Sequence, residues 1–239
     1  MAKGKRKKTS KAGKILWWIA FLAAVAVFLG AGYQLISTLG EYRAAQKEYE
    51  KLEDYVTLPQ EAEEVQSVQE NESQEPEGPV IDFEALKAVN EDVVGWIYVE
   101  ALDLNYPIMQ GEDNEYYLHR TTEKTYNFAG SIFLDYANKA DFSDCNSIVY
   151  GHNMKDGSMF GRLKQFRERE TYEKSLYFWV CTPEKNYRYQ IFSAYETAVG
   201  SDTYLLFEKT GKEFVNYMQE MKKREDPRDV LVTRKGDFL

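Results

Sequence analysis

Cysteine and histidine are scarce in this chain of 239 residues, and basic side chains are outnumbered. The two cysteines, Cys145 and Cys181, form no CxxC pair, and there are two histidines. So few thiols and imidazoles argue against a disulfide-stapled scaffold and against a Cys/His zinc site. No metal and no cofactor is expected. The 30 Lys and Arg are outnumbered by 39 Asp and Glu, which gives a net charge of −9. An acidic body lacks the basic face of a nucleic-acid binder, so no nucleic-acid partner is expected.

Charge is unevenly distributed along the first third of the chain. Residues 1–14 carry seven basic and no acidic side chains, whereas residues 41–79 carry twelve acidic and three basic. Residues 15–36, which lie between them, carry no charge, and about 20 apolar residues suffice to cross a bilayer as a helix. Trp17 and Trp18 at the start, with Tyr33 near the end, occupy positions typical of interfacial aromatic residues.

This pattern predicts a single-pass anchor over 15–36 that contacts the lipid bilayer of the plasma membrane. The basic tail over 1–14 is predicted to stay in the cytoplasm, which puts the C-terminal domain outside the cell. A cleaved signal peptide is the alternative, because Gly30, Ala31 and Gly32 are small. Its apolar core would span only about 7–15 residues, which is shorter than this run, so the uncleaved anchor is favoured.

Two connecting segments are predicted after the anchor. Residues 37–58 are predicted to be a stalk helix, because apolar side chains recur with 3-4-3-4 spacing on one face. These side chains are Tyr42, Ala45, Tyr49, Leu52 and Val56. Residues 59–79 are rich in Glu, Gln, Ser and Pro with almost no large apolar side chains, which predicts an acidic disordered linker. The folded domain is then predicted to comprise residues 80–239.

Short β-rich runs separated by turn residues dominate this predicted domain. A short helix is expected over 83–90, capped by Asp82, and a longer helical pattern lies between Ser201 and Arg224. The runs that indicate strands are 94–99, 106–109, 131–135, 147–150, 176–182 and 187–194. The sequence therefore predicts a mostly antiparallel β domain, of barrel type, with helices at its start and in one long insertion.

His152 is the side chain best placed for proton chemistry. It follows the apolar run SIVYG directly, and an imidazole exchanges protons near neutral pH. A structural histidine is the alternative interpretation. His119, beside Arg120, is interpreted as a solvated surface residue. Neither Cys145 nor Cys181 has an adjacent cationic residue to lower its thiol pKa, so the residues alone identify no nucleophile to work with His152.

Six segments, in this order and spacing, resemble a class B sortase. They read VGWIYV, LNYPIMQGEDNEYYL, GSIFLDYAN, SIVYGHNM, MFGRL and YQIFSAYET. The resemblance covers essentially all of 80–239. It implies an eight-stranded β-barrel with an N-terminal helix and a helix inserted between strands six and seven. It also implies a cysteine transpeptidase that cleaves a sorting signal after Thr and joins the surface protein to a peptidoglycan cross-bridge amine or a pilin Lys amine.

The resemblance assigns roles to residues of this chain. His152 matches the family's histidine, which protonates the leaving group and activates the amine. Five positions match the groove that holds the sorting-signal peptide. They are Asn114, Leu118, Tyr150, Tyr204 and Leu205.

The sequence departs from the family pattern at its end. The family's nucleophilic Cys lies in a TLxTC motif on strand seven, and an oxyanion-binding Arg follows on strand eight. This chain ends DVLVTRKGDFL, so both residues are expected beyond Leu239 and the last strand is expected to be missing. The chain as written is therefore expected to be inactive. Two alternatives stay open, a non-catalytic tethered peptide-binding module and a hydrolase that uses Cys145 or Cys181.

Overall fold

In the computed structural model of this protein, the described residues are 11–59, 78–198, 200–207, 209–223 and 231–234. The chain divides into two units, Met1–Ala44 and Ala45–Leu239. Most of the basic tail predicted over 1–14 and nearly all of the linker predicted over 59–79 lie outside the described residues.

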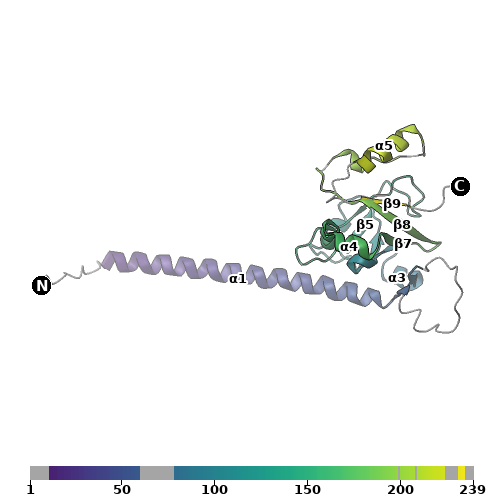
Figure 1. The fold of residues 1–239 in the computed structure, drawn as a ribbon. Helices are drawn as coiled ribbons and strands as arrows, with labels where there is room; N and C mark the ends of the chain where they lie inside the picture. Colours follow the sequence, from purple (N-terminus) through teal and green to yellow (C-terminus); the bar gives the residue numbers. More distant parts are fainter. Residues whose placement is uncertain (1–10, 60–77, 199, 208, 224–230, 235–239) are drawn as a thin grey trace. The chain divides into compact units, whose positions relative to one another are not determined.

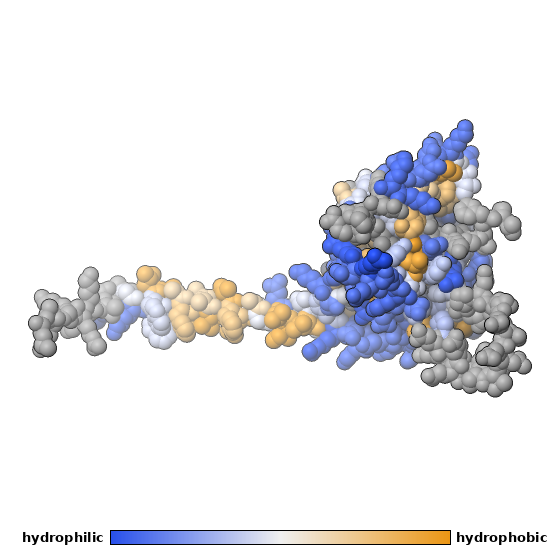
Figure 2. Space-filling model, viewed as in Figure 1, coloured by the Kyte–Doolittle hydropathy of each residue, from blue (hydrophilic) through white to orange (hydrophobic). Residues whose placement is uncertain are grey.

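The first unit consists of the greater part of one long helix, α1 (Lys11–Glu53). The helix from Gly13 onward is long and apolar enough to cross a membrane, a test that a signal sequence near an N-terminus also passes. Large apolar side chains from Ile15 to Leu39 are exposed, and they form the hydrophobic band seen on α1 in Figure 2. Apolar surface of this extent is favourable in lipid rather than in water.

The second unit begins with the end of α1, which packs on the β domain. Ala45, Glu48, Tyr49 and Leu52 are buried there, and burial raises the pKa of the Glu48 carboxyl. The Tyr49 hydroxyl donates to Gly130 O at 2.7 Å, and Glu48 Oε1 accepts from the Glu123 amide at 2.8 Å. Three of these four residues, Ala45, Tyr49 and Leu52, belong to the apolar stripe from which the stalk helix was predicted. The helix ends at Glu53, and this part of the stripe is buried against the domain.

Two short strands that pair with each other flank the acidic segment. β1 (Val56–Thr57) pairs antiparallel with β2 (Val80–Ile81), so residues on either side of the acidic segment lie side by side. The helix α3 (Phe83–Val89) follows, and Asp82 Oδ1 accepts the Ala85 amide hydrogen at 2.9 Å as the predicted N-cap.

The body of the domain is a seven-stranded mixed sheet (Figure 1). Its strands in chain order are β3 (Val93–Val99), β4 (Leu104–Met109), β5 (Ile132–Leu134), β6 (Val149–Tyr150), β7 (Tyr177–Cys181), β8 (Asn186–Ser193) and β9 (Leu231–Arg234). The spatial order is β6-β5-β4-β3-β7-β8-β9. Only the β4–β5 pair is parallel. Each of the six predicted runs overlaps one of the first six strands of this sheet in chain order.

Helical segments connect these strands. The short ones are η1 (Glu100–Leu102), η2 (Tyr117–His119), η3 (Phe160–Arg167), α4 (Arg169–Lys174) and η4 (Asp202–Tyr204). The last helix, α5 (Lys212–Lys223), lies in the chain between β8 and β9, the sixth and seventh strands of the large sheet. The predicted mostly β fold with this inserted helix is confirmed. The described residues supply seven strands to this sheet.

The strand β5 is buried and pairs with β4 on one side and β6 on the other. Ile132, Phe133 and Leu134 are all buried, which is expected for a strand covered on both faces. Gly130, just before β5, has φ +58°, and a Cβ there would overlap the Leu118 carbonyl. Glycine is therefore required for the close approach of β5 to the segment that carries Leu118.

The Tyr49 hydroxyl offers a test of the packing of α1 on the domain. Tyr49→Phe removes a buried hydrogen bond and leaves polar groups of the Gly130 region without this partner. We expect the free energy of unfolding of the domain to fall by about 1–2 kcal/mol, measured by denaturant titration. Tyr126→Phe is the matched control, because Tyr126 is 69% exposed and its substitution should change stability little. Equal stability of Tyr49→Phe and the unmodified protein would contradict the docking of α1.

Candidate active site

His152 lies two residues after β6 and is held by a main-chain carbonyl. Its Nε2 is 2.8 Å from Leu118 O. A carbonyl oxygen only accepts, so Nε2 carries the hydrogen and Nδ1 keeps its lone pair in the neutral ring. Nδ1 has no hydrogen-bond partner among the described residues. The ring is thus oriented by one nitrogen while the other is available to take up or deliver a proton.

His119 lies against His152. The two imidazole rings are stacked, with centroids 5.7 Å apart and planes inclined by 23°. The exposed ring of His119 also contacts Tyr126, at a centroid distance of 6.2 Å. The interpretation of His119 as a merely solvated residue missed this contact. No local pattern indicates it, because the stacking depends on η2 lying beside the segment that follows β6.

Tyr150 is the last residue of β6, and its hydroxyl is committed to a buried carboxylate. Tyr150 Oη donates to Asp135 Oδ2 at 2.8 Å. Partial burial, together with this negatively charged neighbour, raises the pKa of the Tyr150 hydroxyl. Its ring is stacked on that of Tyr204 in η4, with centroids 6.3 Å apart and planes inclined by 10°. Two of the predicted groove residues are therefore in direct contact.

Asn114 reaches the same carboxylate from the connection between β4 and β5. Its Nδ2 donates to Asp135 Oδ2 at 2.9 Å, and its Oδ1 accepts from the Tyr136 amide at 3.1 Å. The turn that carries Asn114 is shaped by Asp113, whose Oδ1 accepts from the amides of Glu115 and Tyr116 at 2.9 and 2.8 Å. This Asp-centred turn is a local feature that sequence alone favours.

The two predicted leucines, Leu118 and Leu205, each accept a hydrogen bond through the main-chain carbonyl. Leu118 is half-buried, and its carbonyl is the acceptor that orients His152. The side chain of Leu205 is 49% exposed, and its carbonyl accepts from Asn146 Nδ2 at 2.7 Å. The predicted residues thus come together from three segments, namely the β4–β5 connection, β6 with its continuation, and η4 with the residue after it.

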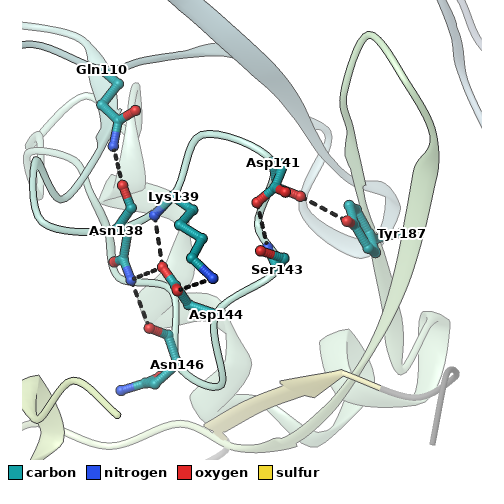
Figure 3. A network of polar contacts seen from close by, with 8 residues as sticks. All are labelled: Gln110, Asn138, Lys139, Asp141, Ser143, Asp144, Asn146 and Tyr187. Carbon is teal, nitrogen blue, oxygen red and sulfur yellow. Dashed lines mark hydrogen bonds and ion pairs between the residues drawn. The ribbon is translucent and has the colours of Figure 1, made fainter. Parts of the chain in front are cut away.

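The connection between β5 and β6, residues 135–148, is braced by its own polar side chains (Figure 3). Asn138 Nδ2 donates to Asp144 Oδ2 at 3.0 Å and to Asn146 O at 2.9 Å, and its Oδ1 accepts from the Ile148 amide. Gln110, directly after β4, donates through Nε2 to Asn138 O at 2.7 Å. This internal bonding, together with the buried side chain of Phe142, fixes the long loop.

Sequence reasoning missed Asp135, Gln110 and Asn146 as members of the site. Asp135 is 7% exposed and receives both Asn114 and Tyr150. One signal was available, because a carboxylate directly after the buried run IFL has to find hydrogen-bond donors. For Gln110 and Asn146 no local signal exists, since their partners are far away in the chain.

The two cysteines differ in environment. Cys181 lies in the middle of the sheet on β7, opposite Trp96 of β3, and is fully buried. Burial raises the pKa of the Cys181 thiol to about 12. Cys145 is half-buried in the loop over 135–148. Among the described residues, no group of three or more His, Cys, Asp or Glu is arranged to hold a metal ion.

Comparisons with known proteins agree on one family. The family model described as a sortase domain matches residues 97–233. A Sortase B of Staphylococcus aureus is 30% identical over 223 residues, which covers 92% of this chain and 86% of that protein. A Sortase B of Listeria monocytogenes is 39% identical over 142 residues, and this match spans 58% of the chain and 56% of that protein's length.

Solved structures give the same result for the fold. The structure of sortase B from B. anthracis in complex with AAEK1 is similar with a TM-score of 0.63 at 26% identity, covering 82% of this chain and 97% of that one. A Staphylococcus aureus sortase B-substrate complex has a TM-score of 0.63 at 29% identity, covering 77% and 80%. Since the sortase model matches more than half of the sequence and both curated relatives are sortases B, this chain belongs to the sortase family and, within it, to class B.

Proposed function

We propose that this chain is the membrane-anchored body of a class B sortase, a cysteine transpeptidase. Such an enzyme cleaves a sorting signal after Thr and joins the surface protein to a cell-wall or pilin amine. One observation carries the proposal: three segments that are separate in the chain carry His152 and the five predicted groove residues, and hydrogen bonds and ring stacking join these segments. The solved Staphylococcus aureus sortase B-substrate complex supports substrate binding, and the ligand proposed for these residues is the sorting-signal peptide.

The chemistry needs a thiolate, an acid-base group and an oxyanion donor. The thiolate attacks the carbonyl carbon of Thr, the bond from this carbon to the next residue's nitrogen breaks, and the leaving amine takes a proton from protonated His152, which leaves an acyl-thioester. An incoming primary amine then attacks the thioester and gives one proton to His152, and the carbon–sulfur bond breaks to release the thiolate. Nδ1 of His152 is the atom proposed for these transfers, because Nε2 is bound to Leu118 O.

Cys181 does not suit the role of nucleophile, and the resemblance assigns this role to neither Cys181 nor Cys145. Cys181 is buried in the sheet with a raised thiol pKa, so it forms little thiolate at neutral pH and is out of reach of a peptide. The resemblance assigns the nucleophile to a TLxTC motif that the 239 residues do not contain. We therefore propose that these residues bind the sorting signal without turning it over.

Thiol labelling with turnover assays tests this proposal. In the folded protein at pH 8, we expect a thiol reagent to modify Cys145 rapidly and Cys181 only after unfolding, as counted by mass spectrometry. Mixing the protein with Thr-containing peptides and a primary amine should give no transpeptidation product. Turnover that is abolished by Cys181→Ala or by Cys145→Ala would contradict the assignment and favour the hydrolase alternative.

A graft of the missing nucleophile tests His152. When the last strands of a class B sortase, with its Cys and Arg, are joined to this chain, we expect transpeptidation to appear. His152→Ala in that fusion should lower kcat/KM by about 10²–10⁴-fold, as for loss of a general acid-base group. His119→Phe is the matched control, because it removes the second imidazole while keeping a ring against His152, and it should lose much less. Equal losses in the two variants would argue against the assignment.

The proposed topology has its own measurement. The candidate span in α1 and the basic residues before it support a cytoplasmic N-terminus with the domain outside the cell. A membrane-impermeant maleimide added to intact cells should therefore label Cys145. The Cys145→Ser variant controls for labelling elsewhere. Labelling of Cys145 only after the cells are broken would contradict this orientation.

A further inference from the structure

One buried carboxylate links two of the predicted groove residues. Asp135 Oδ2 accepts hydrogen bonds from Asn114 Nδ2 at 2.9 Å and from Tyr150 Oη at 2.8 Å. Its other oxygen, Oδ1, accepts the Ala137 amide hydrogen at 2.9 Å. Three donors thus converge on a side chain that is 7% exposed. Such a set satisfies a buried carboxylate without a cationic partner.

The position of this carboxylate is fixed by main-chain contacts on both sides. The Asp135 amide donates to Ile148 O at 2.8 Å, and Gln110 Nε2 donates to Asp135 O at 3.0 Å. Asn138, whose amide also donates to Asp135 O, ties this residue to the braced loop of Figure 3. These main-chain hydrogen bonds hold Asp135 in place independently of its side-chain bonds to Asn114 and Tyr150.

A carboxylate accepts hydrogen bonds and donates none, which determines the polarity of its two partners. The hydroxyl hydrogen of Tyr150 points to Asp135, so Tyr150 Oη has only lone pairs to offer elsewhere. One Nδ2 hydrogen of Asn114 is used by Asp135 and its Oδ1 is used by Tyr136, so the second Nδ2 hydrogen remains. Among the described residues, nothing accepts this hydrogen and nothing donates to Tyr150 Oη.

We propose that Asp135 is a positioning residue that presents Tyr150 as an acceptor and Asn114 as a donor to the bound peptide. The ligand must then offer an N–H group to Tyr150 and a carbonyl to Asn114. An extended backbone offers both groups of one residue on the same side, as in a β-ladder. This inference rests on the proposed peptide-binding function, which it refines by stating the hydrogen-bond polarity of the site.

Removing the charge of Asp135 should reverse this polarity. In Asp135→Asn, a side-chain NH₂ group can donate to Tyr150 Oη, so that the hydroxyl hydrogen is released toward the ligand. The raised pKa of the Tyr150 hydroxyl, caused by its burial and by the Asp135 carboxylate, should fall in the variant because the negative charge is gone.

An amide-to-ester scan of the ligand shows which backbone N–H group donates a hydrogen bond to the protein. Short peptides with a central Thr are made with one backbone N–H at a time replaced by an ester oxygen, and their affinities for the full chain are measured by calorimetry. We expect one ester to weaken binding to the unmodified protein by about tenfold, the loss of one hydrogen bond. That penalty should disappear in Asp135→Asn and in Tyr150→Phe. The same penalty in all three proteins overturns the inference.

Two further measurements keep the inference testable. The Tyr150→Phe variant covers the case in which Asp135→Asn does not fold, and a tyrosine titration without ligand covers the case in which no peptide binds. Tyr150→Phe keeps the ring stacked on Tyr204, so it tests the ester effect even where Asp135→Asn does not fold. NMR titration of ¹³Cζ-labelled tyrosine, assigned with Tyr150→Phe, should show Tyr150 ionising at lower pH in Asp135→Asn. An unchanged Tyr150 titration overturns the inference without any peptide. If no peptide binds the unmodified protein, the proposed function fails, and the titration alone decides whether Asp135 holds the Tyr150 hydrogen.

Discussion

The pairing of β5 with its two neighbours is the constraint on which the candidate site depends. β5 is three residues long, runs parallel to β4 and antiparallel to β6, and is completely buried. Parallel pairing brings the ends of β4 and β5 to the same edge of the sheet, so Gln110 and Asp135 meet there. Antiparallel pairing then sets Tyr150 of β6 opposite Phe133, with its hydroxyl within reach of Asp135.

The same pairing explains why the β4–β5 connection carries so much of the site. Two parallel strands need a crossover from one end of the sheet to the other, and residues 110–131 make it. This crossover supplies Asn114 near the end of β4 and Leu118 near the beginning of β5. The Ser131 amide donates to Tyr117 O at 2.9 Å, which holds η2 against β5 and thereby the Leu118 carbonyl beneath His152.

The end of α1 stabilises this crossover from the other side. Tyr49 bonds to Gly130 O, and the hydroxyl of Ser131, its other partner, donates to Arg120 O at 2.7 Å. Glu48 accepts from Glu123 in the same connection. The segment nearest to the predicted anchor is therefore part of the domain and contacts the loop that orients the imidazole.

The sequence by itself determined the first six strands of the large sheet and the apolar span, and it predicted the acidic linker from composition and His152 as the candidate for proton transfer. These follow from local patterns, namely apolar runs between turn residues, a charge-free stretch, and a histidine placed after a strand. The sequence also indicated the five groove residues, through resemblance, and the structure brings them together without testing their roles.

The tertiary structure alone decided which groups these residues contact. The packing of Tyr49, the stacking of His119 on His152 and the convergence of Asn114 and Tyr150 on Asp135 join residues that are distant in the chain. Their physical reason is the strand order of the sheet, which no local pattern encodes. Periodicity shows that a face will be buried, whereas the partner that buries it is chosen by the packing of the whole domain.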